Sequence, residues 1–590
     1  MKEARLDRPR RTVEWGNGMG VLLQAFYQIG NEGIPIAPHG GMTESWWDHL
    51  ARQAAALRQA GFTAIWLPPV TKGASGKASV GYDVFDDYDI GSKDQKGAVA
   101  TRYGTREQLL RCVAVMRSCG LDVYADLVEN QRGGGSGPGG FTFRYADADG
   151  VVGDGRFPKN PDDFHPNVPQ DPNVPGPDFS FGADLSPING GRPAGSLADQ
   201  LIDSADWLTR SLDLQGYRID DAKGQSSDFL RRFLNSKSMA GKFAVAEYFD
   251  GNIQKVQDWI SRQMQGRASS FDFSLRFILA NMCDSRPFNM ATLDHAGLAG
   301  TIPFQAVTFV ENHDTDRSEP VTQNKMLAYA YILTSEGYPC VFYKDYSTDQ
   351  FCYGLKPHID KLLLVHEQLA DGPTLQRFKD FDVFAYERLG RNHLLVGLNN
   401  AANAARTITV FTGFGSNVEL HDYVGHGANA RTDGAGRATI TIPPNVNGLG
   451  YVCYSRTGAG RSATSQKHAA TQTFEGAQDL DIRPATAGTA VQIGRVFCET
   501  GTLIRGVLTF DDKDFSASTR LALQLFDAAG SKLAETIFRK GDQGRKVEAM
   551  ATTTGFHAFA IVASETPETN PKPHYELDVT YQAPETLGLH

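Results

Sequence analysis

The first 370 residues alternate eight times between two kinds of segment. Short apolar or β-branched runs predict strands at 20–27, 63–67, 121–128, 216–220, 243–247, 270–273, 307–311 and 339–343. Between them, apolar residues at three- and four-residue spacing predict helices, among them 43–60, 105–119, 197–212 and 321–336. Strand–helix alternation of this length favours an α/β fold with a closed parallel (β/α)8 barrel over an open doubly wound sheet.

One interval interrupts the alternation. Residues 131–195 are rich in Gly, Pro, Asp and Asn and have almost no helical period, and they are too many for an ordinary loop. Aromatic residues recur through the interval, which favours a small irregular subdomain inserted after the third strand over a disordered segment. We therefore divide the barrel into residues 1–130 and 196–381, with the insertion between them.

The remainder of the chain has an all-β pattern. Alternating strands separated by turn residues predict a β domain at 382–457, and a Gly/Ser/Ala-rich stretch near 457–465 predicts a linker. Residues 466–590 predict an accessory β-sandwich. All six tryptophans lie before this segment, so we prefer a structural or oligomerisation role for it, with glycan binding second.

Bulk properties exclude several classes of protein. The chain has 590 residues, more than one core usually supports, and its net charge of −10 argues against nucleic acid as a partner. No stretch is long and apolar enough to span a bilayer, and no secretory signal is visible. Seven scattered cysteines without a CxxC pair are typical of reduced thiols. We expect a cytoplasmic protein, or a secreted one if the N-terminus has been trimmed.

Polar residues follow several of the predicted strands. Catalytic groups on a parallel barrel project from the C-terminal ends of its strands. The residues at those ends are Asp126, Asn130, Arg218, Asp220, Glu247, His313 and Asp314. A single Asp or Glu at a strand end is more often a cap or a surface ion pair, but here the three acids Asp220, Glu247 and Asp314 would converge on one mouth with an arginine and a histidine.

A retaining glycosidase needs such a set, with a carboxylate nucleophile close to an acid/base carboxyl group. We assign Asp220 as the nucleophile, kept ionised by Arg218, which points to the same side of the strand. Glu247 would be the general acid/base, with a pKa raised by burial and nearby negative charge. Asp314 and His313 would bind the sugar at the cleavage point, Asp314 also stabilising the transition state.

Five sequence blocks, in order and at suitable distances, resemble those of the α-amylase family of glycoside hydrolases. They lie at residues 126–130, 183–185, 216–223, 246–248 and 309–315. The similarity covers roughly residues 18–455 and is greatest to bacterial liquefying-type α-amylases. Any single block would be weak support, whereas five in order are strong.

The resemblance also implies a substrate-binding set. The segment 81–91 resembles the family's loop after the second strand, in which the tyrosine, here Tyr82, stacks under the sugar being cleaved. The residues implied to bind substrate are Tyr82, Asp126, Gln131, Arg218, Lys223 and His313. The substrate would be an α-glucan.

Two positions depart from the family pattern. Gln131 stands where the family usually has a histidine that touches the sugar's exocyclic hydroxyl, and glutamine can donate a hydrogen bond there but carries no charge. Gly224 stands where a histidine often follows the lysine. We expect altered sugar binding, with the mechanism retained.

The resemblance further implies a structural Ca²⁺ ion that ties the insertion to the barrel. Asn130 and Asp184 match the side-chain ligands, and Gly224 occupies the position that contributes a backbone carbonyl. Ca²⁺ prefers oxygen-only ligation of this kind.

Three functions follow from these observations. Hydrolysis of internal α-1,4 bonds in starch, glycogen or maltooligosaccharides comes first, and transglycosylation through the same covalent intermediate is the alternative within the enzyme class. The third is a non-catalytic glucan-binding protein whose barrel has lost its catalytic activity. The presence of all three acids, Asp220, Glu247 and Asp314, argues against this function. The oligomeric state is not predicted.

Overall fold

The computed structural model describes most of the chain. The described residues are 20–29, 32–34, 44–146, 156–174, 182–187, 196–347, 352–460, 466–476, 487–488, 490–498, 500–510, 516–527, 530–542, 545–552, 555–564 and 575–586. None of the helices in these ranges combines the length and the apolar character that crossing a membrane requires.

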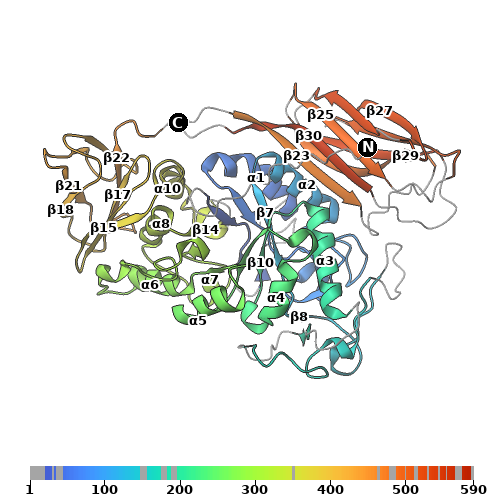
Figure 1. Cartoon of the computed structure of the whole chain (residues 1–590), viewed down its shortest axis with the longest axis horizontal. Helices are drawn as coiled ribbons and strands as arrows, with labels where there is room; N and C mark the ends of the chain where they lie inside the picture. The colour runs from blue at the N-terminus through green and yellow to red at the C-terminus, as the bar shows by residue number, and fades with distance from the viewer. Residues whose placement is uncertain are drawn as a thin grey trace, which may run out of the picture.

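A closed barrel of eight parallel strands forms the centre of the molecule (Figure 1). The strands are β1 (Leu22–Gln24), β4 (Ala64–Trp66), β7 (Asp122–Leu127), β10 (Gly216–Ile219), β11 (Phe243–Ala246), β12 (Ser269–Phe271), β13 (Ala306–Phe309) and β14 (Tyr338–Phe342). They follow one another around the barrel in chain order, and β14 closes on β1. Each predicted strand overlaps one of the eight, so the predicted barrel is confirmed.

The barrel strands are buried on both faces, which explains why their sequences are continuous apolar runs. One cluster of buried residues fills the interior, with Trp66, Tyr124, Phe243, Phe271 and Phe309 among its largest members. A second and larger cluster packs the outer face of the strands against the surrounding helices.

Helices surround the barrel. They are α1 (Trp46–Ala60), α2 (Arg106–Ser118), α3 (Leu197–Leu212), α4 (Ser227–Leu234), α5 (Ile253–Asp258), α6 (Phe273–Asp284), α7 (Thr315–Ser318), α8 (Lys325–Thr334), α9 (Tyr343–Tyr346) and α10 (Lys356–Leu369). The Ser45 side chain caps α1, and Thr105 with Gln108 forms a capping box on α2. The prediction began α8 too early, because Asn324 before it has a left-handed backbone with φ of 51°.

The insertion is packed in its described parts, 131–146, 156–174 and 182–187. β8 (Gln131–Arg132) pairs antiparallel with β9 (Ala183–Asp184), so the two ends of the insertion meet at the barrel. Its rings form a small core: Phe143 packs on Phe164 and Phe85, and Tyr145 packs edge-on against Phe85. Phe179 and Phe181 lie outside the described residues.

A β domain follows the barrel at the left of Figure 1. Its six-stranded sheet has the order β15 (Thr374–Lys379), β16 (Val383–Arg388), β17 (Leu394–Asn399), β22 (Tyr451–Arg456), β19 (Glu419–Asp422) and β20 (Ala430–Arg431). β18 (Arg406–Phe411) and β21 (Arg437–Ile442) form a separate pair. The sheet thus begins before the predicted boundary at residue 382. β15 escaped prediction because it is an edge strand without a buried face.

The last segment is a sandwich of two four-stranded sheets. One has the order β23 (Gln466–Gly476), β30 (Tyr575–Thr586), β25 (Leu503–Phe510) and β28 (Lys546–Met550). The other has the order β24 (Ala490–Cys498), β29 (Gly555–Ala563), β26 (Arg520–Phe526) and β27 (Lys532–Arg539).

The sandwich lies against barrel helices α1, α2 and α3 (Figure 1). Helix α2 contacts the two edge strands β23 and β24, one from each sheet. Its Ala114 is fully buried and belongs to the apolar core of the sandwich. Helix α2 therefore serves two cores, because its other buried residues belong to the barrel.

Candidate active site

The C-terminal ends of β7, β10 and β11 bring the predicted polar residues together. Arg218 on β10 is in register with Asp126 on β7 and with Val245 on β11. Asp220 and Glu247 directly follow the last residues of β10 and β11. Because neighbouring parallel strands end at one edge, these side chains converge on the mouth of the barrel.

Arg218 is the centre of this cluster, and its side chain is only 1% exposed. Its Nη1 donates to Asp126 Oδ1 at 2.8 Å and to Asp220 Oδ1 at 2.5 Å. Its Nη2 donates to Glu247 Oε2 at 2.6 Å. One guanidinium group thus holds three carboxyl groups that are far apart in the sequence, with the planar donor geometry that only arginine offers.

The environments of the three carboxyl groups differ. Burial raises the pKa of Glu247 well above its usual range, and the charges of Asp220 and Asp314 raise it further against the effect of Arg218. Burial also raises the pKa of Asp220, with Arg218 acting in the opposite direction through charge and hydrogen bond. Burial raises the pKa of Asp126 to about 7, again opposed by Arg218. Glu247 is therefore the group most disposed to hold a proton near neutral pH.

Two aromatic donors complete the surroundings of Asp126. Its Oδ2 accepts from Trp66 Nε1 at 3.0 Å and from the Tyr82 hydroxyl at 2.9 Å. The Tyr82 ring lies parallel to the ring of His313, with 5.2 Å between centroids and 6° between planes. Tyr82 therefore joins Asp126 to the opposite side of the mouth.

His313 and Asp314 follow β13 and contact each other. Gln24 Nε2 lies 3.0 Å from His313 Nδ1, and His313 Nε2 lies 3.3 Å from Asp314 Oδ2; a proton on Nε2 satisfies both contacts. Burial lowers the pKa of His313 to about 4, so the ring is neutral at pH 7. Arg317 Nη2 donates to Asp314 Oδ1 at 2.9 Å. The sequence prediction missed both Gln24 and Arg317.

The remaining predicted substrate residues lie on two sides of the acids. Gln131 is 1% exposed and donates to the Tyr82 carbonyl at 3.0 Å. Lys223 donates to Asp250 Oδ2 at 2.9 Å and to the Phe249 carbonyl at 3.2 Å. The Phe249 ring is 50% exposed, close to the acid/base candidate, and was not predicted.

The residues predicted to bind calcium lie where the insertion joins the barrel. Asn130 and Gly224 line one small cavity, and a Cβ added to Gly224 would lie 3.0 Å from Asn130 Oδ1. The Asn130 carbonyl accepts from the backbone N–H of Leu185, which follows Asp184. Gln170 Nε2 donates to Asp184 Oδ2 at 2.6 Å.

This donor set suits a hard cation by its chemistry. Within the described ranges, the Asn130 side chain has no hydrogen-bond partner although the residue is buried. No group of three or more His, Cys, Asp or Glu residues that could hold a metal occurs in the same ranges. The predicted ligands are instead an amide, a carboxylate and a backbone carbonyl, all oxygen donors of the kind that Ca²⁺ accepts.

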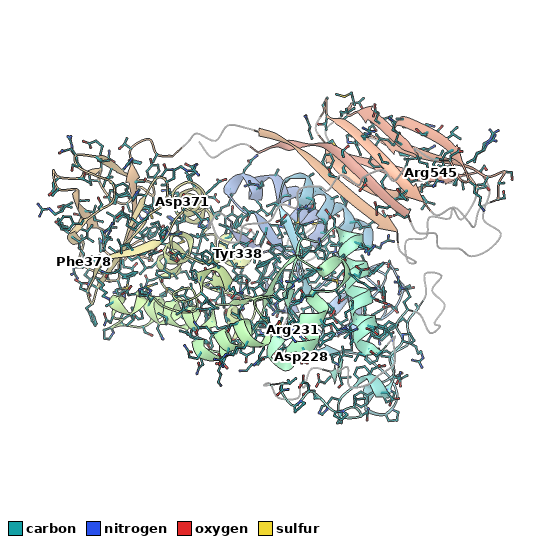
Figure 2. The ribbon with its side chains drawn as sticks, viewed as in Figure 1. Asp228, Arg231, Tyr338, Asp371, Phe378 and Arg545 are labelled. Atoms are coloured by element: carbon teal, nitrogen blue, oxygen red, sulfur yellow. The ribbon has the colours of Figure 1, made fainter. Side chains whose placement is uncertain are left out.

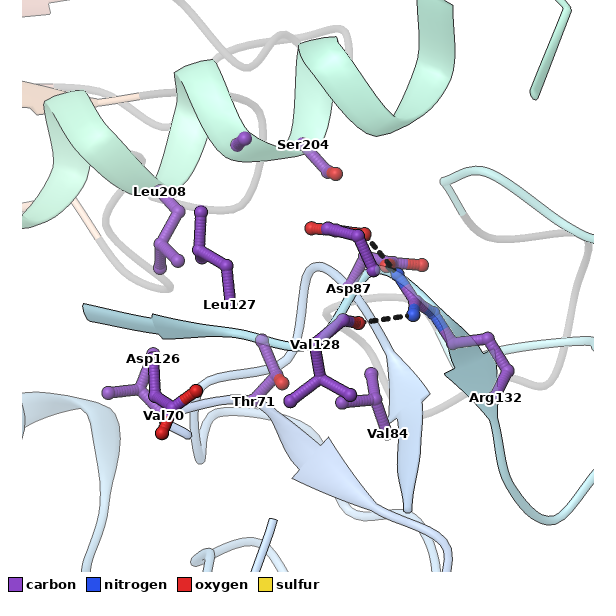
Figure 3. Close-up of a pocket in the computed structure, with 12 residues that line it drawn as sticks. Val70, Thr71, Val84, Asp87, Asp126, Leu127, Val128, Arg132, Ser204 and Leu208 are labelled. Atoms are coloured by element: carbon purple, nitrogen blue, oxygen red, sulfur yellow. Dashed lines mark hydrogen bonds and ion pairs between the residues drawn. The ribbon is translucent and has the colours of Figure 1, made fainter. Parts of the chain in front are cut away.

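A buried ion cluster also anchors the insertion, beside the cavity drawn in Figure 3. Arg132 binds Asp87, donates to Glu129 Oε2 at 2.7 Å and donates to the Val128 carbonyl at 2.6 Å. Lys159 binds the other oxygen of Asp87. Although burial acts to raise it, the charges of Arg132 and Lys159 lower the pKa of Asp87 to about 2. The insertion is thus held by charge pairs as well as by its aromatic core.

A parallel (β/α)8 barrel with neighbouring carboxyl groups at its C-terminal mouth defines a class, the barrel glycoside hydrolases. The α-amylase of Geobacillus stearothermophilus is 31% identical over 401 residues, 58% of this chain and 72% of that protein. The α-amylase of Bacillus licheniformis is 30% identical over 435 residues, 65% of this chain and 82% of that protein. The chain belongs to the α-amylase family, and it is an α-amylase-like glycoside hydrolase.

The structural comparison agrees with the fold. The γ-CGTase of alkalophilic Bacillus clarkii superposes with a TM-score of 0.57 at 18% identity, over 91% of this chain and 80% of that one. At this identity the likeness concerns the fold alone. No protein-family model matches the chain.

Proposed function

We propose that this protein hydrolyses internal α-1,4 bonds of starch, glycogen or maltooligosaccharides with retention of configuration. Asp220 attacks the anomeric carbon while Glu247 protonates the departing oxygen, which gives a glucosyl ester on Asp220 and a shortened glucan. Glu247 then takes a proton from water, which attacks the ester and frees the second product as the α-anomer. Glu247 is thereby protonated again, and cleavage of the ester restores the carboxylate of Asp220.

The observation that carries this proposal is the sharing of Arg218 by Asp126, Asp220 and Glu247. The guanidinium orients Asp220 through Oδ1 and favours its ionised form. It also holds Glu247 beside Asp220 on the neighbouring strand, as a retaining mechanism requires.

The contacts of Glu247 indicate where its proton lies. Oε2 accepts from Arg218 Nη2 at 2.6 Å and from the Asp221 backbone N–H at 3.1 Å, so that oxygen is unsuited to carry a proton. Oε1 has no hydrogen-bond partner among the described residues. We therefore assign the catalytic proton to Oε1, from which the leaving oxygen of the substrate would take it.

The sugar at the cleavage point would be held by Asp314, Tyr82 and His313. Asp314 would bind its hydroxyl groups and stabilise positive charge in the transition state. The neutral His313 ring would direct its Nε2 proton toward Asp314 and the sugar, and Gln24 would fix that orientation. Gln131 Oε1 is buried without a partner in the described part of the chain and would accept from a sugar hydroxyl.

A calcium ion would be held by the side chains of Asn130 and Asp184 and by the Gly224 carbonyl. When bound, it would join the insertion to the barrel and so support Gln131, the neighbour of Asn130. The acidic chain has no feature that suggests nucleic acid as a partner, and a cytoplasmic location stays a prediction.

The test uses purified protein with calcium, maltooligosaccharides and soluble starch, followed by chromatography and anomer-resolved NMR. Shorter products that first appear as the α-anomer, and are absent with Glu247→Gln, are expected. Longer products would indicate a transglycosylase instead. No turnover of any α-glucan by the wild type would refute the proposal.

The covalent step has its own test. An α-glucosyl fluoride needs little protonation to leave, so Glu247→Gln should form the ester on Asp220 but hydrolyse it slowly. Mass spectrometry of the peptide containing Asp220 should show one added glucosyl unit. Glu247→Gln combined with Asp220→Asn is the matched control, and labelling of that double variant would contradict the assignment of Asp220.

A further inference from the structure

An exposed aromatic ring lies at the mouth of the barrel, outside the residues discussed so far. Tyr353 is 49% exposed and precedes α10. Its backbone N–H donates to the Lys344 carbonyl at 2.6 Å, in the short helix α9 that directly follows β14. Tyr353 therefore belongs to the C-terminal end of the barrel, where substrate binds.

The phenol group connects this ring to the segment that carries Asp314. The Tyr353 hydroxyl donates to Asp316 Oδ1 at 2.9 Å, and Lys344 Nζ donates to Asp316 Oδ2 at 2.6 Å. Asp316 is in α7, two residues after Asp314, and its side chain is only 4% exposed. A buried carboxylate thus fixes the outer end of an otherwise exposed side chain close to the proposed sugar site.

Two ammonium groups support the ring from the protein side. Lys325 Nζ lies 4.2 Å and Lys344 Nζ 5.1 Å from the ring centroid. Their side chains are only 10% and 15% exposed, so neither covers the solvent side of a half-exposed ring. The ring is therefore fixed by buried neighbours, while about half of the residue's surface is open to solvent.

We propose that the open face of Tyr353 is a sugar-stacking platform for a glucan unit beyond the one being cleaved. A rigid aromatic face with a polar tip suits the apolar C–H face of a glucose ring at small entropic cost. Glu247 on β11 protonates the leaving group, whereas Tyr353 stands beside β13 and β14, two and three strands further around the barrel. The platform therefore binds the part of the glucan that stays attached to Asp220.

This proposal rests on the proposed function and is tested with full-length Tyr353→Ala, Tyr353→Phe and Tyr353→Trp. The measurement is kcat/KM on maltooligosaccharides from maltotriose to maltoheptaose. For Tyr353→Ala we expect a loss of roughly tenfold, equivalent to about 1.4 kcal/mol, on the longer substrates and little change on the shortest. Tyr353→Phe and Tyr353→Trp should keep most activity, because both retain a flat ring.

The matched control is Phe304→Ala. Phe304 is 66% exposed in η8 (Pro303–Gln305), just before β13 and so at the opposite end of the barrel, and its loss should leave every length unchanged. An equal loss for Tyr353→Ala at all lengths, or no loss at any, would overturn the platform while the proposed hydrolysis stands. A wild type inactive on every glucan would instead remove the proposed function itself.

Discussion

Replacement of Arg218 by methionine tests the charge arrangement at the barrel mouth. Methionine has a similar length but no charge, so Asp126, Asp220 and Glu247 lose their shared cation. Removing one partner of a buried ion pair typically costs about 3–5 kcal/mol. With a urea dependence of about 3 kcal/mol/M, the unfolding midpoint should fall by about 1 M or more.

The loss of stability should depend on pH with a definite sign. Arg218 lowers the pKa of all three carboxyl groups, so its removal raises them further above their unfolded values. A group with a raised folded pKa contributes stability that is present below its unfolded pKa, near 4, and lost as pH rises through the folded pKa. For Asp126 the folded pKa is already about 7 with the cation present. The variant should therefore be less impaired at pH 5 than at pH 8.

The assay is urea unfolding followed by tryptophan fluorescence at both pH values. The last tryptophan is Trp259, so the signal reports the barrel region rather than the two β domains. The control is Arg231→Met. Arg231 pairs with Asp228 on helix α4 (Figure 2), the two side chains are 28% and 79% exposed, and pairs open to solvent are worth at most about 1 kcal/mol. A deficit of equal size at pH 5 and pH 8, or none at either, would refute the argument.

Four further predictions address other parts of the molecule. In the pH profile of kcat/KM, the alkaline limb should lie above the usual carboxyl range, because Glu247 must be protonated and burial raises its pKa. A limb near pH 4 to 5 would contradict the proposed role of Glu247 as the acid. Gln131→His places a group that can be cationic beside Asp220, so the acid limb should move to lower pH, which the same profiles would detect. Asp184→Ala should lower the Tm when calcium is present. In excess chelator, the variant and the wild type should have the same Tm. An equal difference in Tm in both media would argue against calcium ligation by Asp184. Ala114→Arg buries a charged side chain between α2 and the sandwich and should lower the free energy of unfolding by about 3 kcal/mol or more, measured by calorimetry. An unchanged Tm would mean that the sandwich does not depend on α2.

The sequence predicted the barrel well because its strands carry a strong signal. Parallel strands buried on both faces are continuous apolar runs, and several of them end beside polar residues that are candidates for the active site. The β domain was predicted less completely. β15 is exposed or half-exposed along its length and pairs only with β16 in its sheet, so it lacks the continuous burial of that neighbour.

The site was predicted as a set of residues but not as a network. Gln24 and His313 are 289 positions apart, and no local pattern indicates that one orients the other. The same applies to Tyr353 and Asp316, which share a hydrogen bond although they are 37 positions apart. Motif and strand position indicate the candidate catalytic groups, whereas their supporting contacts depend on closure of the barrel.

Charge balance at the mouth explains how similar carboxyl groups could take different roles. Arg218 is one cation against Asp126, Asp220 and Glu247, so full ionisation would leave excess negative charge in a buried site, which is costly. Asp126 receives two further hydrogen bonds at Oδ2, which favour its ionised form, and Asp220 receives the shortest of the three bonds from Arg218. Of the three carboxyl groups, Glu247 is the one that most favours its protonated form, and the whole cluster thus supports its proposed role as the acid.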